Sequence, residues 1–423
     1  MSSEDNSRQE IKPALAFHLY TLPLNMALGS SGLLTTLIAL TLGASVQDIG
    51  VMTAAGAAAT IVFSTLWGRL SDLAGMRRRY LVIFFMTLGP IFLAMSIATI
   101  VPQLILLYTL LAVFTSGITP IATMYTVENC RAKNWQAEVA RYNSMSSLGT
   151  ILGLSVNTVV ALFLKTRWLF YISAATCFLA ASILWKTGRE PEMTLERHLF
   201  PVTFHDAERF LSPRPIFHYL RMRSLSFPKN LKQLKQLKPL QLLFIACLIH
   251  WIGVYFFSVG QTPLMKDLGL SDSMQLAINA ATNAAAAYSF VAIAPSFQAS
   301  QKRSIHTAVI FRGCLIFCWA ALPLILIHSV PFIFTLALVL SVVFNILYPV
   351  VWLPMTTFAV SQAPAGSGGT SQGQLLSIAA LANAVGSALG GIVITAYGFT
   401  WGFVVAGILT ILAVPVFSRI DIT

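Results

Sequence analysis

The chain has 423 residues, of which 56% are hydrophobic and 10% are charged, and its mean hydropathy is +0.75. Soluble domains carry about 25% charged residues, so this composition excludes a soluble globular protein. The formal net charge of +12 would suit a nucleic-acid-binding protein, but the basic residues lie mostly in loops between apolar runs. The sequence therefore predicts no nucleic-acid partner.

Apolar runs of about 20 residues recur along the chain, and each is long enough to cross a hydrocarbon core of about 30 Å. Membrane lipids are therefore the expected surroundings of these runs. In chain order, we predict twelve membrane-spanning helices, at residues 14–42, 48–70, 79–100, 103–127, 140–164, 168–187, 240–263, 273–296, 305–327, 331–359, 372–396 and 400–418.

One long polar segment divides the predicted spans into six and six. We therefore expect an N-terminal six-helix bundle (1–187), a basic cytoplasmic linker (188–239) and a C-terminal six-helix bundle (240–423). Within the linker, leucines and lysines alternate at three-residue spacing over residues 231–238. This pattern predicts an amphipathic helix on the anionic inner leaflet, and a regulatory or partner-docking helix is the alternative.

Basic residues are distributed unequally between the two ends of the predicted spans. With the N-terminus placed in the cytoplasm, the outer loops hold only Lys165, Arg167 and Lys266, and nearly all other basic residues are cytoplasmic. This asymmetry follows the positive-inside rule. We therefore predict a multi-pass protein of an inner (plasma) membrane with both termini in the cytoplasm.

The turn after the first predicted span recurs in the second half of the chain. Residues 42–59 read LGASVQDIGVMTAAGAAA, and residues 268–285 read LGLSDSMQLAINAATNAA. Duplicated bundles of apolar helices are a common architecture of membrane transporters, which bind substrate between the halves. Glycine pairs at four-residue spacing also recur in the fifth and eleventh spans: Gly149, Gly153, Gly386 and Gly390. We interpret these pairs as a moving interface between the two halves.

The loop between the second and third spans carries the most specific motif, Gly68-Arg-Leu-Ser-Asp72-Leu-Ala-Gly75-Met-Arg77. It resembles the signature loop of the major facilitator superfamily, which has two glycines, an aspartate and a basic residue at this spacing. The resemblance extends to the span number, the central loop and the duplication. It implies an all-α membrane protein with twelve transmembrane helices in two pseudo-symmetric six-helix bundles.

In that superfamily the loop is a conformational latch that holds the two halves together in the outward-facing state. The resemblance assigns this role to Gly68, Asp72, Gly75, Arg77 and Glu128. The glycines allow a tight turn, and Asp72 needs a positive partner. Two are available, namely Arg77 and the N-terminus of the predicted eleventh helix. Glu128 lies at the inner end of the fourth helix, at the position where the superfamily often has an acid that shares the arginine. Surface charge that only sets the topology is the alternative.

Two positions distinguish the chain from the drug–proton antiporters of the superfamily. Val113 stands where those proteins carry an arginine in the fourth span, and Leu154 follows Gly153 where they carry proline. The segment 124–149, MYTVENCRAKNWQAEVARYNSMSSLG, is loosely similar to the sugar-efflux branch. The resemblance therefore favours an efflux protein outside the drug–proton group.

By the same resemblance, the first, fourth, seventh and tenth helices line a central cavity. Polar and aromatic side chains of these helices, with one asparagine of the eighth, are the candidate substrate contacts: Asn25, Tyr125, His250, Trp251, Tyr255, Asn283, Asn345, Tyr348 and Trp352. An amide in hydrocarbon must be satisfied, so each asparagine either bonds a neighbouring helix or faces a wet cavity. Aromatic rings beside amides suit sugars and amphiphilic compounds, although such rings also serve packing in any membrane bundle.

Ionisable groups within the spans narrow the substrate class. His250 lies near the middle of its span and is the candidate for proton coupling, because imidazole changes charge near neutral pH. A neutral, hydrogen-bonded histidine is the alternative. We expect Arg312 to extend toward the headgroups. No carboxylate is expected at mid-depth, so the sequence favours a neutral, zwitterionic or anionic substrate over a strongly cationic one.

These observations predict a monomeric secondary active transporter that moves a small polar or amphiphilic organic solute by alternating access. We expect proton-coupled efflux by antiport, and proton-coupled uptake of a small metabolite is the alternative. No cofactor or metal is expected, because the five cysteines are scattered. A membrane-embedded enzyme would need a nucleophile, acid pair or metal cluster that the sequence lacks. A sensor or scaffold would need an appended soluble domain, for which the central loop is too short and too basic.

Overall fold

The structure, a computed structural model, describes residues 18–129, 135–190, 239–293, 301–324, 329–361 and 368–420. Nearly all of these residues are helical, and no strand occurs among them. The predicted all-α membrane fold is thereby confirmed. Most of the predicted linker, with its amphipathic helix, lies outside the described residues, so that prediction stays open.

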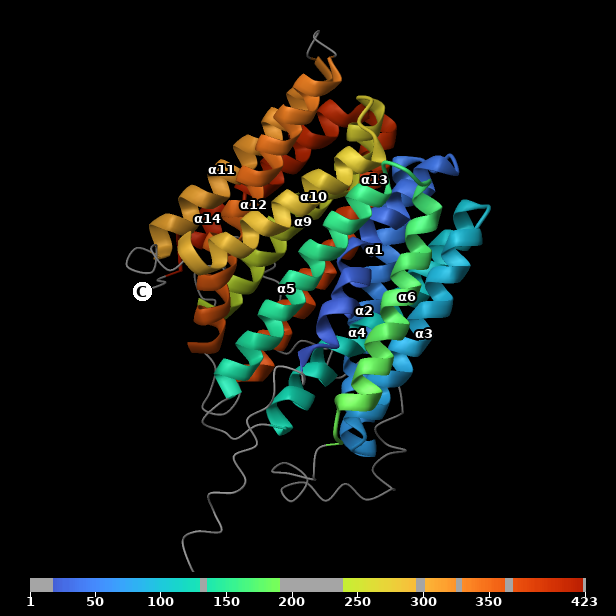
Figure 1. The fold of residues 1–423 in the computed structure, drawn as a ribbon. Coiled ribbons are helices and arrows are strands. Elements are labelled where there is room, and N and C mark those ends of the chain that lie inside the picture. The colour runs from blue at the N-terminus through green and yellow to red at the C-terminus, as the bar shows by residue number, and fades with distance from the viewer. Residues whose placement is uncertain are drawn as a thin grey trace, which may run out of the picture.

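The first six helices form one group, which we call the N-terminal half. They are α1 (Thr21–Thr41), α2 (Val46–Ala74), α3 (Arg77–Ile97), α4 (Val101–Glu128), α5 (Trp135–Val160) and α6 (Thr166–Thr187). Figure 1 shows them, coloured blue to green, gathered into one bundle. Within it, α1 packs on α5 and α6, α2 packs on α4, and α3 packs on α6.

The remaining helices form the C-terminal half, which lies beside the first bundle in Figure 1. They are α9 (Pro239–Asp267), α10 (Asp272–Tyr288), α11 (Gln301–Ala321), α12 (Val330–Ser361), α13 (Gly368–Ile411) and α14 (Val414–Phe417). A π-helical turn (Ser289–Ile293) extends α10, and a 3-10 turn (Leu322–Leu324) ends α11. The α9 helix packs mainly on α13, as α1 packs on α5 in the other half.

Ten helices in the described ranges are long and apolar enough to cross a membrane. The α13 helix contains two predicted spans, because Gly398 (φ 82°, ψ 169°) interrupts its helical backbone. The α5 helix is long enough but less apolar, since Asn143 and Asn157 lie on it. With α13 counted as two helices and α5 included, the twelve predicted spans fit the fold.

The duplicated sequence folds into the same turn in both halves. Gly43 and Gly269 have φ values of 83° and 84°, a left-handed conformation that glycine adopts without steric cost. Ser45 then caps α2 by accepting a hydrogen bond from the Asp48 N–H, and Ser271 caps α10 in the same way. The repeat is therefore a repeat of structure, as the pseudo-symmetric architecture requires.

The glycine pairs of the fifth and eleventh spans lie within the halves and not between them, which corrects the predicted moving interface. A Cβ on Gly153 would lie 2.3 Å from the Met26 carbonyl oxygen of α1, and one on Gly390 would lie 2.7 Å from the Phe256 carbonyl oxygen of α9. Small residues let paired helices approach this closely. The glycines therefore hold α1 against α5 and α9 against α13.

The two halves meet through α2 with α13 and through α5 with α10. Three hydrogen bonds between described residues join the halves: Gln47 to Thr395 (3.0 Å), Ser273 to Thr158 (2.9 Å) and Thr166 to Asp272. All three lie near the turns 42–45 and 268–271. We call this end of the molecule the closed end, and the opposite end, which carries residues 77–79 and 302–303, the basic end.

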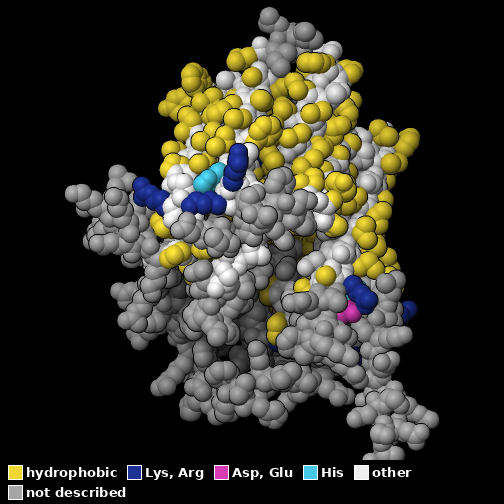
Figure 2. Space-filling view, turned by 90° about the vertical axis from the view of Figure 1, so that its left-hand side faces the viewer, with side chains coloured by type: hydrophobic (Ala, Val, Ile, Leu, Met, Phe, Trp, Pro, Cys, Tyr) yellow, Lys and Arg dark blue, Asp and Glu magenta, His cyan; other side chains and the backbone are white. Residues whose placement is uncertain are grey.

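The outer surface of the bundle is largely hydrophobic, as contact with lipid requires. Large hydrophobic side chains such as Ile83, Leu106 and Leu179 are exposed on the helices. Figure 2 shows hydrophobic side chains covering most of the described helical surface on one face, with lysine and arginine side chains gathered below them. A multi-pass membrane protein explains this apolar exterior, because lipid tails replace water around it.

Candidate functional site

Four predicted aromatic residues form one cluster between α9 and α12, which we call the aromatic cluster. The ring of Trp251 lies 5.8 Å from Tyr255, 5.6 Å from Tyr348 and 5.8 Å from Trp352. Tyr348 and Trp352 stack on each other at 6.1 Å because residues four apart share a helix face. Trp251 is buried, whereas the other three rings are only partly buried, so the cluster has an accessible side.

Arg312 of α11 reaches into this cluster instead of extending to the headgroups, which corrects the prediction for this residue. Its side chain is 2% exposed, and its guanidinium carbon lies 5.5 Å from the Trp251 ring centroid and 4.2 Å from that of Phe344. The guanidinium Nη1 lies 3.1 Å from Nε2 of His250, which is fully buried. Arginine only donates hydrogen bonds, so Nε2 is the acceptor and carries no proton in this conformation.

The other predicted contacts lie outside the aromatic cluster or at its margin. Asn345 lies one turn from Tyr348 and donates to the Ser341 carbonyl at 2.9 Å. Asn25 faces α5, where a Cβ on Gly149 would approach it, and Asn283 bonds within α10. Tyr125 is buried near the basic end, beside Gly188 at the end of α6. The structure thus brings together His250, Trp251, Tyr255, Tyr348 and Trp352, but not Asn25, Tyr125 and Asn283.

A polar cavity that the sequence did not predict lies in the N-terminal half. It has a volume of about 220 Å³ and is bounded by α1, α2, α4 and one residue of α13. Its polar lining residues are Ser31, Thr53, Thr60, Tyr108, Thr115 and Asn383. The one available signal was the spacing of Thr53, Gly56 and Thr60, which places them on one face of α2. A wider groove of about 560 Å³ on α3 and α4 is lined almost entirely by apolar side chains and suits lipid contact.

At the basic end, two of the predicted latch residues form an ion pair. Arg77 donates from Nε to Glu128 Oε2 at 2.8 Å and from Nη2 to Glu128 Oε1 at 2.7 Å, a bidentate geometry. Its Nη1 donates to the Ser71 hydroxyl at 2.9 Å. Gly75 ends α2 with a φ of 65°, and Gly68 lies within that helix. The side chains of Asp72 and of the first residues of α13 lie outside the description.

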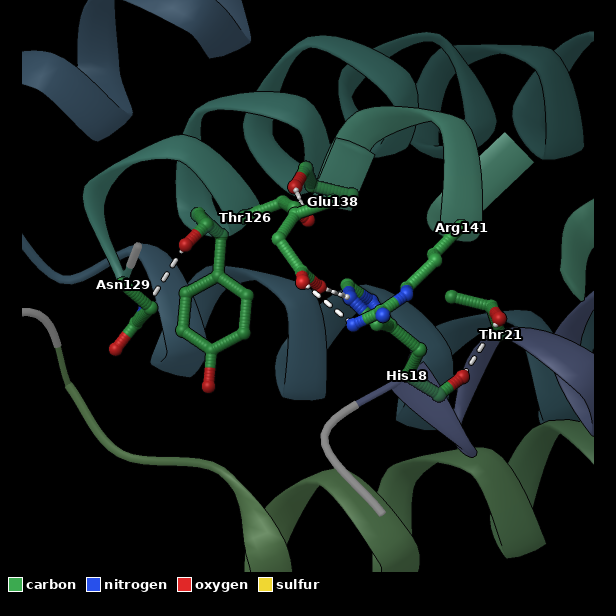
Figure 3. Close-up of polar contacts among 8 residues, drawn as sticks. His18, Thr21, Thr126, Asn129, Glu138 and Arg141 are labelled. Atoms are coloured by element: carbon green, nitrogen blue, oxygen red, sulfur yellow. Dashed lines mark hydrogen bonds and ion pairs between the residues drawn. The ribbon is translucent and has the colours of Figure 1, made fainter. Parts of the chain in front are cut away.

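A second ionisable group at the basic end was not predicted, although His18 lies within the first predicted span, 14–42. His18 Nε2 lies 2.9 Å from Glu138 Oε2, and Arg141 donates to Glu138 Oε1 at 2.7 Å. Figure 3 shows these side chains converging from the starts of α1 and α5, beside Thr126 and Asn129 at the end of α4. Both His18 and Glu138 are about 3% exposed, so the carboxylate needs its partners. We call this group the His18 trio.

A model of the Major Facilitator Superfamily matches residues 20–387 of the chain. Among curated proteins, no sequence matches closely enough to count as a relative. Solved structures share the fold at low sequence identity. A bacterial homologue of the human lysosomal transporter Spinster, in an inward-facing and occupied conformation, is 15% identical with a TM-score of 0.70, and the match covers 96% of each chain.

Two further transporters show how widely this fold is used. The nucleoside transporter NupG is 15% identical with a TM-score of 0.69, covering 96% of this chain and 99% of that one. A D-xylose–proton symporter is 16% identical with a TM-score of 0.66, covering 96% and 95%. Identities this low establish the fold alone. Because the family model spans most of the chain and the two helical halves have the expected architecture, the protein belongs to the major facilitator superfamily and is a membrane transporter, not an enzyme.

Proposed function

We propose that this transporter moves a small polar or amphiphilic organic solute by alternating access between its two halves. The observation that carries the proposal is the polar cavity among α1, α2 and α4, to which the C-terminal half contributes Asn383. Across the bundle, the partly buried aromatic cluster offers ring faces for apolar parts of a solute and polar tips for its hydroxyl groups. Packing alone would not require six polar side chains to face a cavity among membrane-spanning helices.

The orientation follows from the distribution of charge. We propose that the basic end faces the cytoplasm of an inner or plasma membrane, with both termini on that side. Because the halves are joined at the closed end, we propose with this orientation that the conformation is inward-facing. We also propose the division into bundles 1–187 and 240–423 with the linker 188–239 between them, and a monomeric transporter. Efflux remains the proposed direction, on the loose similarity to the sugar-efflux branch, and uptake is the second candidate.

We propose that Gly68, Asp72, Gly75, Arg77 and Glu128 act as a conformational latch. The bidentate pair of Arg77 and Glu128 supports this role, because it fixes the arginine at the start of α3, beside the end of α2. The latch closes on α13 only in the outward-facing state. Asp72→Asn should therefore impair transport while leaving expression intact, and unchanged transport would remove the latch proposal.

Proton coupling is proposed at His250, with the His18 trio as a second candidate. His250 Nε2 accepts from Arg312 in this conformation, so a proton at that atom requires the contact to break during the cycle. The trio places the buried Glu138 carboxylate in direct contact with the His18 imidazole, at 2.9 Å.

Flux into proteoliposomes tests the proposed transport. Vesicles with an imposed pH gradient would be offered labelled sugars, nucleosides, organic acids and amino acids, one class at a time. We expect saturable, gradient-dependent uptake of one class, and weaker substrate binding by Tyr255→Ala or Trp352→Ala without loss of thermal stability. Trp168→Ala, on the exposed surface of α6, is the matched control. If the cluster variants mainly lower the melting temperature, the aromatic residues serve packing.

A further inference from the structure

The C-terminal half contains a buried cation with unused hydrogen-bonding capacity. Arg312 donates to His250 from Nη1, but its Nε has no acceptor. Trp251 Nε1 is also buried without an acceptor, and its ring lies 5.5 Å from the Arg312 guanidinium carbon. Buried donors are nearly always satisfied in native proteins. Two unsatisfied donors in one cluster therefore mark a place where an acceptor binds.

Among the described residues, no carboxylate forms an ion pair with Arg312. Between Asp272 and Asp421 the sequence contains neither aspartate nor glutamate. Asp272 lies at the closed end, where Lys266 and Thr166 bind its carboxylate. A charge near the middle of a membrane protein is by default a functional group, because its burial is costly. The compensating charge must therefore arrive with a ligand.

The residues around Arg312 indicate the chemistry of the rest of that ligand. Phe344 and Trp251 cover the guanidinium, while Tyr255, Tyr348 and Trp352 continue the aromatic wall to an accessible side. A guanidinium binds carboxylates through two parallel hydrogen bonds, a geometry that an ammonium group does not offer. An aromatic wall of this kind accepts an apolar or aromatic body.

We propose that Arg312 and Trp251 recognise the anionic group of the substrate, and that the substrate is an organic carboxylate with an apolar or aromatic body. This inference rests on the proposed transport function. His250 is a positioning residue, because it accepts a hydrogen bond from Nη1 and holds the guanidinium in the cluster. The carboxylate binds Arg312 Nε and Trp251 Nε1, which are the donors that the protein leaves free.

Binding of a matched pair of probes to the purified full-length protein tests this site. Phenylacetate and phenylacetamide have the same body but differ in charge. We expect phenylacetate to raise the melting temperature saturably and to alter tryptophan fluorescence, and phenylacetamide to do neither. Arg312→Gln should weaken phenylacetate binding at least about tenfold, since a charged hydrogen bond is lost. Arg303→Gln, at an exposed position of the same helix, should bind as the wild type does.

Arg312→Lys distinguishes a loss of binding from a failure to fold. It keeps the positive charge, so it should bind phenylacetate with intermediate affinity. Equal stabilisation by the two probes, or undiminished binding by Arg312→Gln, overturns the proposal. An absence of response to phenylacetate and to longer aromatic and aliphatic carboxylates overturns it as well. Transport of a neutral solute that survives Arg312→Gln rejects anion recognition and leaves the proposed transport intact. Carboxylate binding without any transport rejects the transport function instead.

Discussion

At the scale of single residues, His250 has two roles that substitution can separate. Its Nε2 accepts from Arg312, and the imidazole is also the proposed proton carrier. His250→Ala removes both, so we expect the pH dependence of flux to become flatter. His250→Gln keeps an acceptor for Arg312 but does not titrate, so it should retain substrate binding while losing the pH response.

The measurement is the pH profile of flux in proteoliposomes, with His306→Ala as the control. His306 lies on α11 near the basic end and outside the aromatic cluster, so its variant should keep the wild-type profile. An unaltered profile in His250→Ala would reassign His250 to structure alone. The His18 trio would then be the remaining candidate for proton coupling.

The ion pair of Arg77 and Glu128 permits a second test at this scale. Glu128→Gln leaves one uncharged acceptor for two guanidinium donors, so we expect the free energy of unfolding to fall by about 1–3 kcal/mol and transport to slow. Thermal unfolding and flux are measured on the same preparation. Glu190→Gln is the control, since Glu190 accepts from the Arg78 N–H near the same end. Equal flux in the two variants would support topology-setting charge over a latch.

The positions of residues were predictable from the sequence where a residue's own helix determines its position. Trp251, Tyr255, Tyr348 and Trp352 were predicted as substrate contacts on two helices, and they meet because their spacing places them on facing sides of those helices. Arg312 was misplaced because its depth along α11 does not reveal which helix it faces. Its burial follows from tertiary contacts with α9 and α12, which no local pattern encodes.

At the scale of helices, close packing of α1 on α5 keeps the N-terminal half rigid. Gly153→Ala would place a methyl group 2.3 Å from the Met26 carbonyl oxygen, so we expect a loss of about 1–3 kcal/mol in stability. Gly32→Ala is the matched control, because its methyl group would meet only the Tyr108 hydroxyl at 3.9 Å. Thermal unfolding in detergent checks both variants. Equal melting temperatures would show that α1 and α5 separate without cost.

The lengths of the apolar runs predicted the positions of the helices well, but they predicted the helix ends less accurately. The second predicted span, 48–70, became Val46–Ala74, because Ser45 caps the start and Gly75 ends the helix. The first, 14–42, was predicted from its apolar run, yet α1 begins only at Thr21. Capping and turn residues set these boundaries, and an apolar run does not mark them. The glycine pairs were found correctly, but only contacts between helices show which helix each pair faces.

At the scale of the whole molecule, the closed end is the proposed gate on the outer side. Here Gly50 lies so close to α13 that a Cβ would be 2.6 Å from the Ser387 carbonyl oxygen. Gly50→Ala therefore forces the halves apart at this end. Overpacking costs about 1–3 kcal/mol, which shifts a two-state equilibrium about 5- to 150-fold toward the outward-facing state.

Accessibility of the cavity measures that shift. A cysteine introduced at Thr53, which lines the cavity, would be labelled in intact cells by a membrane-impermeant maleimide, in a protein without its native cysteines. We expect faster labelling in Gly50→Ala than in Gly32→Ala, because only the first substitution opens the closed end. Equal rates would mean that the α2–α13 contact is static packing, and the gate would then have to lie at the other contact between the halves, where α5 meets α10.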